Sequence, residues 1–266
     1  MTNILAILRA ERFSPNSVDK DKAIMDAVCQ RLGSCGAHIS MISEEQLTAG
    51  IKTDIILTMG RMKATNAILK QYEAIGIPVI NSPKGIEACK RNVIDGIMRN
   101  NGIPTAPRNG SGAMWIKRCD EAAQSKNDII FARNKAEAEQ AVRAFEQRGV
   151  TELLITDHVE GDLIKFYGVV GTGFFKTFYP TDDGISKFGD ETYNGSSHHY
   201  EFDKNRMQQD TEKAAATAGV CVYGGDCIVR QDGSYAIIDF NDWPSFSRCR
   251  AEAAEAIEKA VTKLSL

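Results

Sequence analysis

The chain has 266 residues, of which 43% are hydrophobic and 25% charged, and its formal net charge is −3. This composition is typical of a globular protein of one or two domains, and it excludes collagen-like, low-complexity and globally basic nucleic-acid-binding chains. No apolar run approaches the roughly 20 residues that span a bilayer. We therefore expect neither nucleic acid nor a membrane among the partners.

The cysteines and the first residues favour an intracellular setting. The seven cysteines are odd in number and form no Cys-x-x-Cys pair, which argues against a disulfide framework or a structural zinc site. The first nine residues, MTNILAILR, lack the basic region and the cleavage site of a signal peptide and predict a strand instead. We expect reduced thiols in a cytoplasmic protein.

The first 82 residues alternate short apolar runs with helical patterns. We predict strands over 3–9, 38–43, 54–59 and 78–80, and helices over 18–32 and from just after Gly60 to about 75. Strands that alternate with helices are typical of a small parallel α/β domain. No Gly-x-Gly-x-x-Gly follows the first strand, so a dinucleotide-binding Rossmann half is not expected.

The pattern becomes richer in strands after Asn81-Ser82-Pro83. A helix is predicted over 85–101, followed by a linker over 102–107. We predict strands over 113–118, 128–132, 152–159, 163–171, 173–180, 223–230 and 235–240, and helices over 135–147, 204–218 and 250–263. The segment 181–202 is predicted to be a long polar loop, and loops of that length are usually functional.

Three oxygen-bearing side chains stand out near the end of the chain. Asp239 and Asn241 alternate with apolar Ile238 and Phe240, which places both polar side chains on one face of a strand. Asp226, in the preceding strand, can join them. Two carboxylates and an amide oxygen are hard ligands that suit Mg²⁺. The pattern therefore predicts a magnesium site, and Mg²⁺ in turn favours a phosphate substrate.

Basic residues precede this acidic set along the chain. Arg91 lies on the helix predicted over 85–101, and Lys117 and Lys165 lie in predicted strands. Two spaced basic side chains can hold the α- and β-phosphates of a nucleotide as point charges. A strand edge between them can offer backbone groups to adenine, and an acidic residue after it can accept hydrogen bonds from ribose hydroxyls.

Taken together, these segments resemble the ATP-grasp superfamily over about residues 82–266. The segments Asn81-Ser82-Pro83, Ile86-Glu87-Ala88-Cys89 and Gly102-Ile103-Pro104 are similar to those that lead into the grasp. The resemblance implies an α/β (α+β) protein with a small parallel pre-ATP-grasp domain over 1–82. A two-lobed ATP-grasp domain with antiparallel sheets would follow over 83–266, with the small lobe at about 108–158 and the large lobe at about 159–266. It also implies ATP and Mg²⁺ as cofactors.

The resemblance implies a role for each matching residue. Arg91 stands where the family has a phosphate-binding lysine, and Lys117 is similar to the second such lysine. The remaining matches are the adenine hinge at Asp157, His158 and Val159, the ribose-binding acid Asp162, and the metal ligands Asp226, Asp239 and Asn241. The loop 119–127 lacks the glycines that often cover the triphosphate, and Ser125 or Lys126 is the candidate substitute.

Two chemistries fit the resemblance. Most ATP-grasp proteins are ligases that phosphorylate a carboxylate, whereas the inositol phosphate kinases phosphorylate a hydroxyl or a phosphate. Asp239 stands where many ligases carry Glu, and Gly224 stands where ligases of the D-alanine type often carry Arg. The sequence thus favours a kinase of the inositol phosphate type that transfers the γ-phosphoryl group to a small anionic molecule. The alternative is a carboxylate–amine ligase acting through an acyl phosphate, and a nucleotide-binding regulatory protein comes third.

Candidate acceptor-binding residues are basic side chains near the motifs and in the long loop. They are Lys165, Lys176, Lys187, His198, His199, Arg206, Arg248 and Arg250. Of these, Lys165 and Arg248 are the catalytic candidates, and Lys165 would stabilise the transferring group. We expect the protein to be a monomer or a homodimer.

Overall fold

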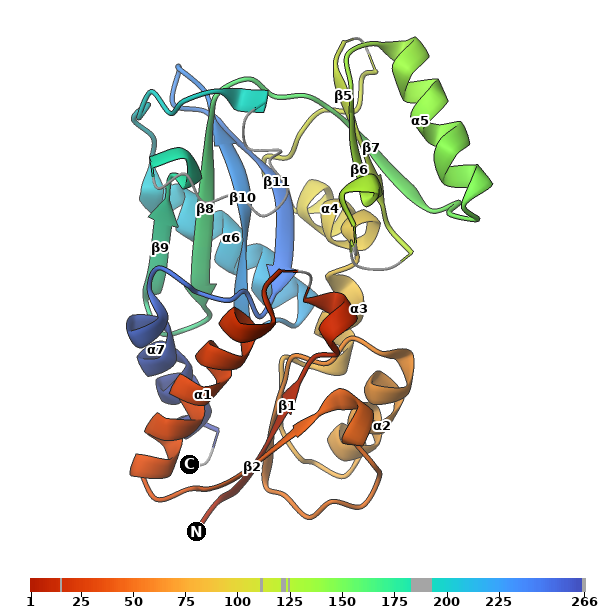
Figure 1. Cartoon of the computed structure of the whole chain (residues 1–266). Coiled ribbons are helices and arrows are strands. Elements are labelled where there is room, and N and C mark those ends of the chain that lie inside the picture. Colours follow the sequence, from red (N-terminus) through yellow and green to blue (C-terminus); the bar gives the residue numbers. More distant parts are fainter. Residues whose placement is uncertain (15, 111, 121–122, 124, 183–192, 265–266) are drawn as a thin grey trace.

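The computed structural model describes the whole chain except residues 15, 111, 121–122, 124, 183–192 and 265–266. Three sheets organise the described residues, and each is covered by helices (Figure 1). Short 3-10 helices lie between the main elements: η1 (Glu11–Phe13), η2 (Glu44–Gln46), η3 (Lys126–Asp128) and η4 (Pro180–Asp182).

The N-terminal sheet is parallel, with strand order β2-β1-β3-β4. Its elements are β1 (Asn3–Leu8), α1 (Val18–Ser34), β2 (His38–Ser43), β3 (Ile55–Thr58), α2 (Lys63–Ala74) and β4 (Val79–Ile80). Successive β1 residues pack on opposite sides, since Ile4 and Ala6 join the core with α1 whereas Leu5 and Ile7 join the core with α2. Burial on both faces explains the continuous apolar runs at residues 4–8 of β1 and 55–57 of β3.

The predicted helix over 85–101 is in fact two helices, α3 (Pro83–Ala88) and α4 (Arg91–Asn100). The break falls at Cys89 and at Lys90, whose backbone is extended. Helix α3 also packs closely against the end of α6 (Lys204–Ala218): a side chain at Gly85 would clash with the backbone of Gly219. The apolar spacing continues through the break, so periodicity alone could not reveal it. As a result Arg91 is the first residue of α4.

The small lobe is an antiparallel sheet of order β6-β5-β7 with one helix on its face. It comprises β5 (Met114–Arg118), β6 (Ile129–Ala132), α5 (Lys135–Gln147) and β7 (Leu153–Asp157). Ile116 and Phe145 are fully buried in a core cluster made only of residues from this lobe.

The large lobe is an antiparallel sheet of order β11-β10-β8-β9. It comprises β8 (Asp162–Val169), β9 (Phe174–Phe178), α6 (Lys204–Ala218), β10 (Val222–Val229), β11 (Tyr235–Asp242) and α7 (Arg250–Thr262). One parallel sheet followed by two antiparallel sheets confirms the expected fold class.

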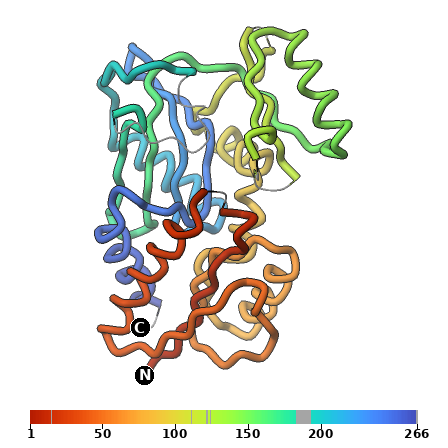
Figure 2. The backbone as a smooth tube through the Cα atoms, in the orientation of Figure 1, coloured from red at the N-terminus to blue at the C-terminus, as the bar shows by residue number. Residues whose placement is uncertain are grey.

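The N-terminal sheet and the large lobe share one hydrophobic core. Helix α7 packs on α1, as the red and blue segments that run side by side in Figure 2 show. The cluster between them includes Ile24 from α1, Ile257 from α7 and the fully buried Trp243. No helix in the described part of the chain is long and apolar enough to cross a membrane.

Candidate functional site

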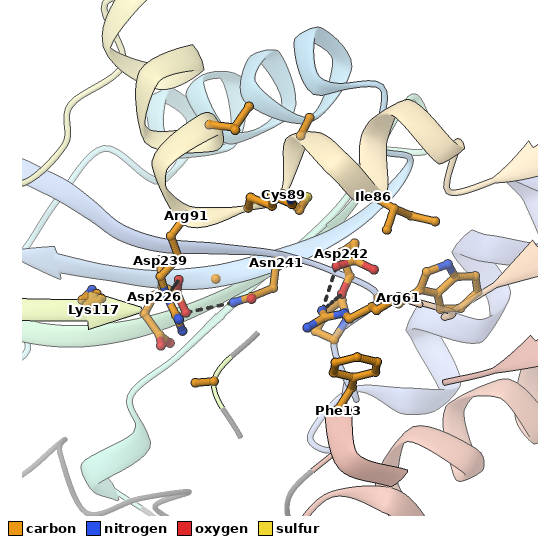
Figure 3. A pocket seen from close by; sticks show the side chains of 18 of the residues that line it. Phe13, Arg61, Ile86, Cys89, Arg91, Lys117, Asp226, Asp239, Asn241 and Asp242 are labelled. Carbon is orange, nitrogen blue, oxygen red and sulfur yellow. Dashed lines mark hydrogen bonds and ion pairs between the residues drawn. The ribbon is translucent and has the colours of Figure 1, made fainter. Parts of the chain in front are cut away.

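A cavity of about 1270 Å³ lies where the three sheets meet. The carboxylates of Asp226 and Asp239, the basic residues Arg91 and Lys117, and Arg61 from the N-terminal sheet all line it (Figure 3). The cavity therefore brings together side chains from distant parts of the sequence.

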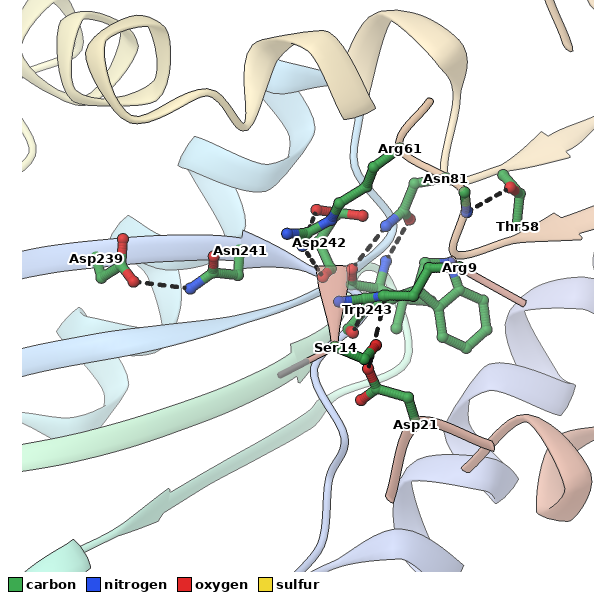
Figure 4. A network of polar contacts seen from close by, with 12 residues as sticks. Arg9, Ser14, Asp21, Thr58, Arg61, Asn81, Asp239, Asn241, Asp242 and Trp243 are labelled. Carbon is green, nitrogen blue, oxygen red and sulfur yellow. Dashed lines mark hydrogen bonds and ion pairs between the residues drawn. The ribbon is translucent and has the colours of Figure 1, made fainter. Parts of the chain in front are cut away.

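The three predicted metal ligands lie together in this cavity. Asp226 and Asp239 are register partners on β10 and β11. Asn241 lies on the same face as Asp239, and its Nδ2 donates to Asp239 Oδ2 at 3.0 Å (Figure 4). No group of three His, Cys, Asp or Glu side chains suited to a metal ion occurs among the described residues. The oxygen donors here are thus two carboxylates and one amide.

Three cations surround these oxygens. Lys165 Nζ lies 3.0 Å from Asp226 Oδ1, and Arg91 Nε lies 3.5 Å from Asp239 Oδ1. Lys117 is buried and donates to the carbonyl of Ile238 at 2.8 Å. The structure therefore brings together Arg91, Lys117 and Lys165, three of the four basic residues that the sequence singled out for phosphate binding and transfer.

Burial and the neighbouring charges shift the pKa values of Lys117 and Asp239 in this cluster. Burial lowers the pKa of the Lys117 ammonium, and the attraction of Asp239 does not outweigh that effect. Burial alone would raise the pKa of Asp239, but Arg91 and Lys117 together hold it below its ordinary value. Asp239 is therefore a carboxylate at neutral pH, the form that binds a cation.

The predicted hinge, Asp157, His158 and Val159, lines the cavity between the two lobes. The Asp157 carboxylate accepts from the backbone N–H groups of Asn109 and Gly110 at 2.9 and 2.8 Å, so it fixes the chain that enters the small lobe. Trp115 Nε1 donates to His158 Nδ1 at 3.1 Å. Burial lowers the pKa of His158, and its ring is accordingly neutral near pH 7.

An apolar wall adjoins the hinge. Its members are buried or half-buried aliphatic side chains from both lobes: Ile129, Val159, Leu163, Ile228 and Ile238. Such a wall between two sheets suits a flat heteroaromatic ring, which gains affinity from apolar contact on its faces.

Asp162 and Arg248 do not line the cavity, contrary to the expectation from sequence. The buried Asp162 carboxylate accepts from the backbone N–H groups of His198 and Tyr200 at 2.7 and 2.9 Å. Arg248 donates to the carbonyl of Tyr179 at 3.1 Å. Both side chains are instead hydrogen-bonded to backbone outside the regular strands. Their partners come from segments that local sequence spacing does not reveal.

Most of the other basic candidates also point elsewhere. Lys176 pairs with Glu252 at 2.7 Å, and His199 lies 3.4 Å from Asp182. Lys187 and residues 121, 122 and 124 of the loop 119–127 lie outside the described residues. The backbone N–H and the hydroxyl of Ser125 both donate hydrogen bonds to the Asp128 carboxylate. Of the eight basic acceptor candidates, Lys165 lines the cavity.

The structure adds two arginines that the sequence analysis missed. Arg9 and Arg61 line the cavity from the N-terminal sheet. Arg61 Nη2 donates to Asp242 Oδ1 at 2.7 Å, and Arg9 Nη2 donates to the Trp243 carbonyl at 2.7 Å (Figure 4). Each follows a strand of a parallel sheet, β1 or β3, and ligands bind open α/β sheets at those carboxyl ends. Their position at or just after the ends of predicted parallel strands could have identified both arginines from the sequence.

The buried Glu44 holds these loops in place. Its carboxylate oxygens accept hydrogen bonds from three backbone N–H groups. Oε1 accepts from Ala10 at 2.6 Å, and Oε2 accepts from Arg61 and Met62, each at 2.8 Å. Thr65 Oγ1 donates to the same carboxylate at 3.1 Å. Because one side chain ties the ends of β1, β2 and β3 together, the positions of Arg9 and Arg61 are coupled.

No protein-family model and no curated protein matches this chain. Solved structures match it in fold. D-alanyl-alanine synthetase A from Vibrio cholerae has a TM-score of 0.72 and 13% identity, with 100% of this chain and 99% of that chain covered. D-alanine–D-alanine ligase from Bacillus anthracis, in complex with ATP, has a TM-score of 0.71 and 14% identity, with the same coverage.

A RimK-domain ATP-grasp protein from Sphaerobacter thermophilus is also similar, with a TM-score of 0.66 and 12% identity. There, 97% of this chain and 99% of that chain are covered. The likeness spans the whole of each molecule, and the fold of this protein is the ATP-grasp fold.

Proposed function

We propose that this protein is an Mg-ATP-dependent ligase that activates a carboxylate as an acyl phosphate and joins it to an amine. One observation carries the proposal. A single cavity brings the oxygen donors and cations around Asp239 and Lys117 together with Arg9 and Arg61. The similarity in fold to D-alanine–D-alanine ligases supports it.

The donor set fits Mg²⁺ held jointly with phosphate. Mg²⁺ is usually bound by one or two carboxylates together with substrate phosphates and water, rather than by a full protein cage. Asp226, Asp239 and the Asn241 amide oxygen would hold it. Bound there, the ion would neutralise the charge that develops on the transferring phosphoryl group.

The chain's own residues then have separate tasks. Lys117 and Arg91 hold the phosphates as fixed charges, and Lys165 stabilises the transferring group. The hinge and the apolar wall hold the adenine. In the first step the acceptor carboxylate oxygen attacks the γ-phosphorus and ADP leaves. In the second step the amine attacks the acyl carbon, phosphate leaves, and the nitrogen loses a proton.

The acceptor carboxylate needs a cation, and position 224 of β10, two residues before Asp226, has no space for one. A Cβ at Gly224 would lie 2.8 Å from the Phe166 carbonyl oxygen and 2.9 Å from the Tyr167 ring. An arginine there, as in ligases of the D-alanine type, has no room. We assign the role to Arg61 and Arg9, since a guanidinium matches a carboxylate with two parallel hydrogen bonds.

Three more basic residues also line the cavity: Arg12, Lys63 and Lys84. None has an ion-pair partner within the part of the chain that the structure describes. The excess of positive charge favours an acceptor with more than one anionic group, such as an acidic amino acid or a short peptide.

A kinase of the inositol phosphate type is the second candidate, and Asp239 in place of Glu favours it. Hydroxylamine separates the two, because it converts an acyl phosphate into a hydroxamate and leaves a phosphate ester intact. We expect hydroxamate and ADP when amino acids or short peptides are supplied with Mg-ATP and hydroxylamine. A stable phosphomonoester formed from a polyol phosphate, without hydroxamate, would support the kinase instead.

A further inference from the structure

Residues 193–200, named here the return segment, run back along the hinge and contact both lobes. Asn194 Nδ2 donates to the carbonyl oxygens of Val159 and Gly161 at 2.9 and 3.2 Å. The ring of the neighbouring Tyr193 packs on Phe131 and Trp115 of the small lobe, with centroid distances of 4.3 and 5.3 Å. The amide of Asn194 is thereby fixed at the hinge.

The two carbonyl partners determine which way this amide points. A carbonyl oxygen only accepts, so the atom that faces both of them must be the amide nitrogen. Asn194 lines the cavity, and its Oδ1 has no donor among the described residues. The acceptor oxygen is thus the polar atom of this side chain that remains for a ligand.

The backbone carbonyl of Val159 also bears on how a base would bind beside Asn194. The Val159 carbonyl, which lies at the hinge beside the apolar wall, already accepts from Asn194. A base that sits against Val159 and Ile238 therefore meets a side-chain acceptor at the place where a hinge would otherwise offer its backbone carbonyl.

We propose that Asn194 selects the nucleotide base, with its Oδ1 accepting a hydrogen bond from the exocyclic 6-amino group of adenine. This inference rests on the proposed function in taking the nucleotide to be ATP. A purine with a 6-oxo group would place one acceptor against another. A purine with no 6-substituent would leave Oδ1 without its donor.

The test is equilibrium binding of nucleotides to the full-length protein by calorimetry, with Mg²⁺ present and no acceptor. The probes are ATP, inosine triphosphate and purine riboside triphosphate, which lacks the 6-substituent. We expect the wild type to bind ATP roughly tenfold more tightly than purine riboside triphosphate. Asn194→Ala should reduce that ratio toward one while leaving the affinity for purine riboside triphosphate within about twofold.

Ser196→Ala is the matched control, because Ser196 is an exposed residue of the same segment, and it should keep the wild-type ratio. Equal weakening of all three nucleotides by Asn194→Ala would mean a purely structural role and would overturn the inference. A wild type that binds ATP, inosine triphosphate and purine riboside triphosphate equally tightly would also overturn the inference. Failure of every nucleotide to bind would overturn the proposed function as well.

Discussion

Asp239 is the residue on which most of the site converges. Arg91, Lys117 and Asn241 all act on its carboxylate. Asp239→Asn removes the negative charge while keeping the size, so the cation would lose a ligand and the two basic groups a partner. We expect ATP-dependent turnover, measured as ADP release against Mg²⁺ concentration, to fall about a hundredfold or more.

Asp232→Asn is the control for this variant, since Asp232 lies at the exposed turn between the same two strands. It should turn over at the wild-type rate. Undiminished turnover by Asp239→Asn would show that the metal is held elsewhere.

Arg61 tests the opposite end of the cavity. Arg61→Lys keeps a charge beside Asp242 but loses the planar pair of donors. We expect KM for the acceptor to rise roughly tenfold while the affinity for ATP stays unchanged. Arg31→Lys alters an arginine that pairs with Glu258 outside the cavity, and it should change neither. A loss of ATP affinity in Arg61→Lys would place this residue at the nucleotide instead.

At the scale of elements, strand β8 begins with a carboxylate that anchors the return segment. Burial alone would raise the pKa of Asp162, but the N–H groups of His198 and Tyr200 lower it below its ordinary value. A lowered pKa means that Asp162 stabilises the fold above the unfolded value, about 4. That contribution is lost as the pH falls through the lower, folded-state pKa.

Unfolding by urea at a series of pH values measures this effect. We expect Asp162→Asn to be less stable than the wild type by about 1–3 kcal/mol at pH 7. The difference should shrink below about pH 4, as the wild-type carboxyl becomes protonated. A difference that stays constant down to pH 3 would contradict the role of the ionised carboxylate.

The elements show why some of the site could be predicted and some could not. Alternation of Asp239 and Asn241 with apolar residues is a local property of one strand, and it placed both correctly on one face of β11. Arg9 and Arg61 become neighbours of the end of β11 only through the order of the parallel sheet and its packing on the large lobe. Asp162 has its partners in a distant loop, which spacing in β8 cannot reveal.

At the scale of the whole molecule, the small lobe has a hydrophobic core of its own. Its core, around Ile116 and Phe145, includes no residue of the other two units, which share the core around Trp243. We expect native-state hydrogen exchange to show the small lobe opening at lower free energy than β1 and β10. Mg-ATP should raise protection most in the small lobe, and equal protection throughout would contradict this division.

The Asp157 N–H donates to the Pro107 carbonyl at 2.8 Å, so the chain leaves for the small lobe and returns from it at adjacent points. The lobe is therefore an insertion whose two ends a few glycines could join. Excising residues 108–157 would remove no member of the core clusters outside that lobe. The shortened chain would keep β10, β11, Arg9 and Arg61 but lose Lys117, so acceptor binding could be measured without the part of the nucleotide site that the small lobe contributes.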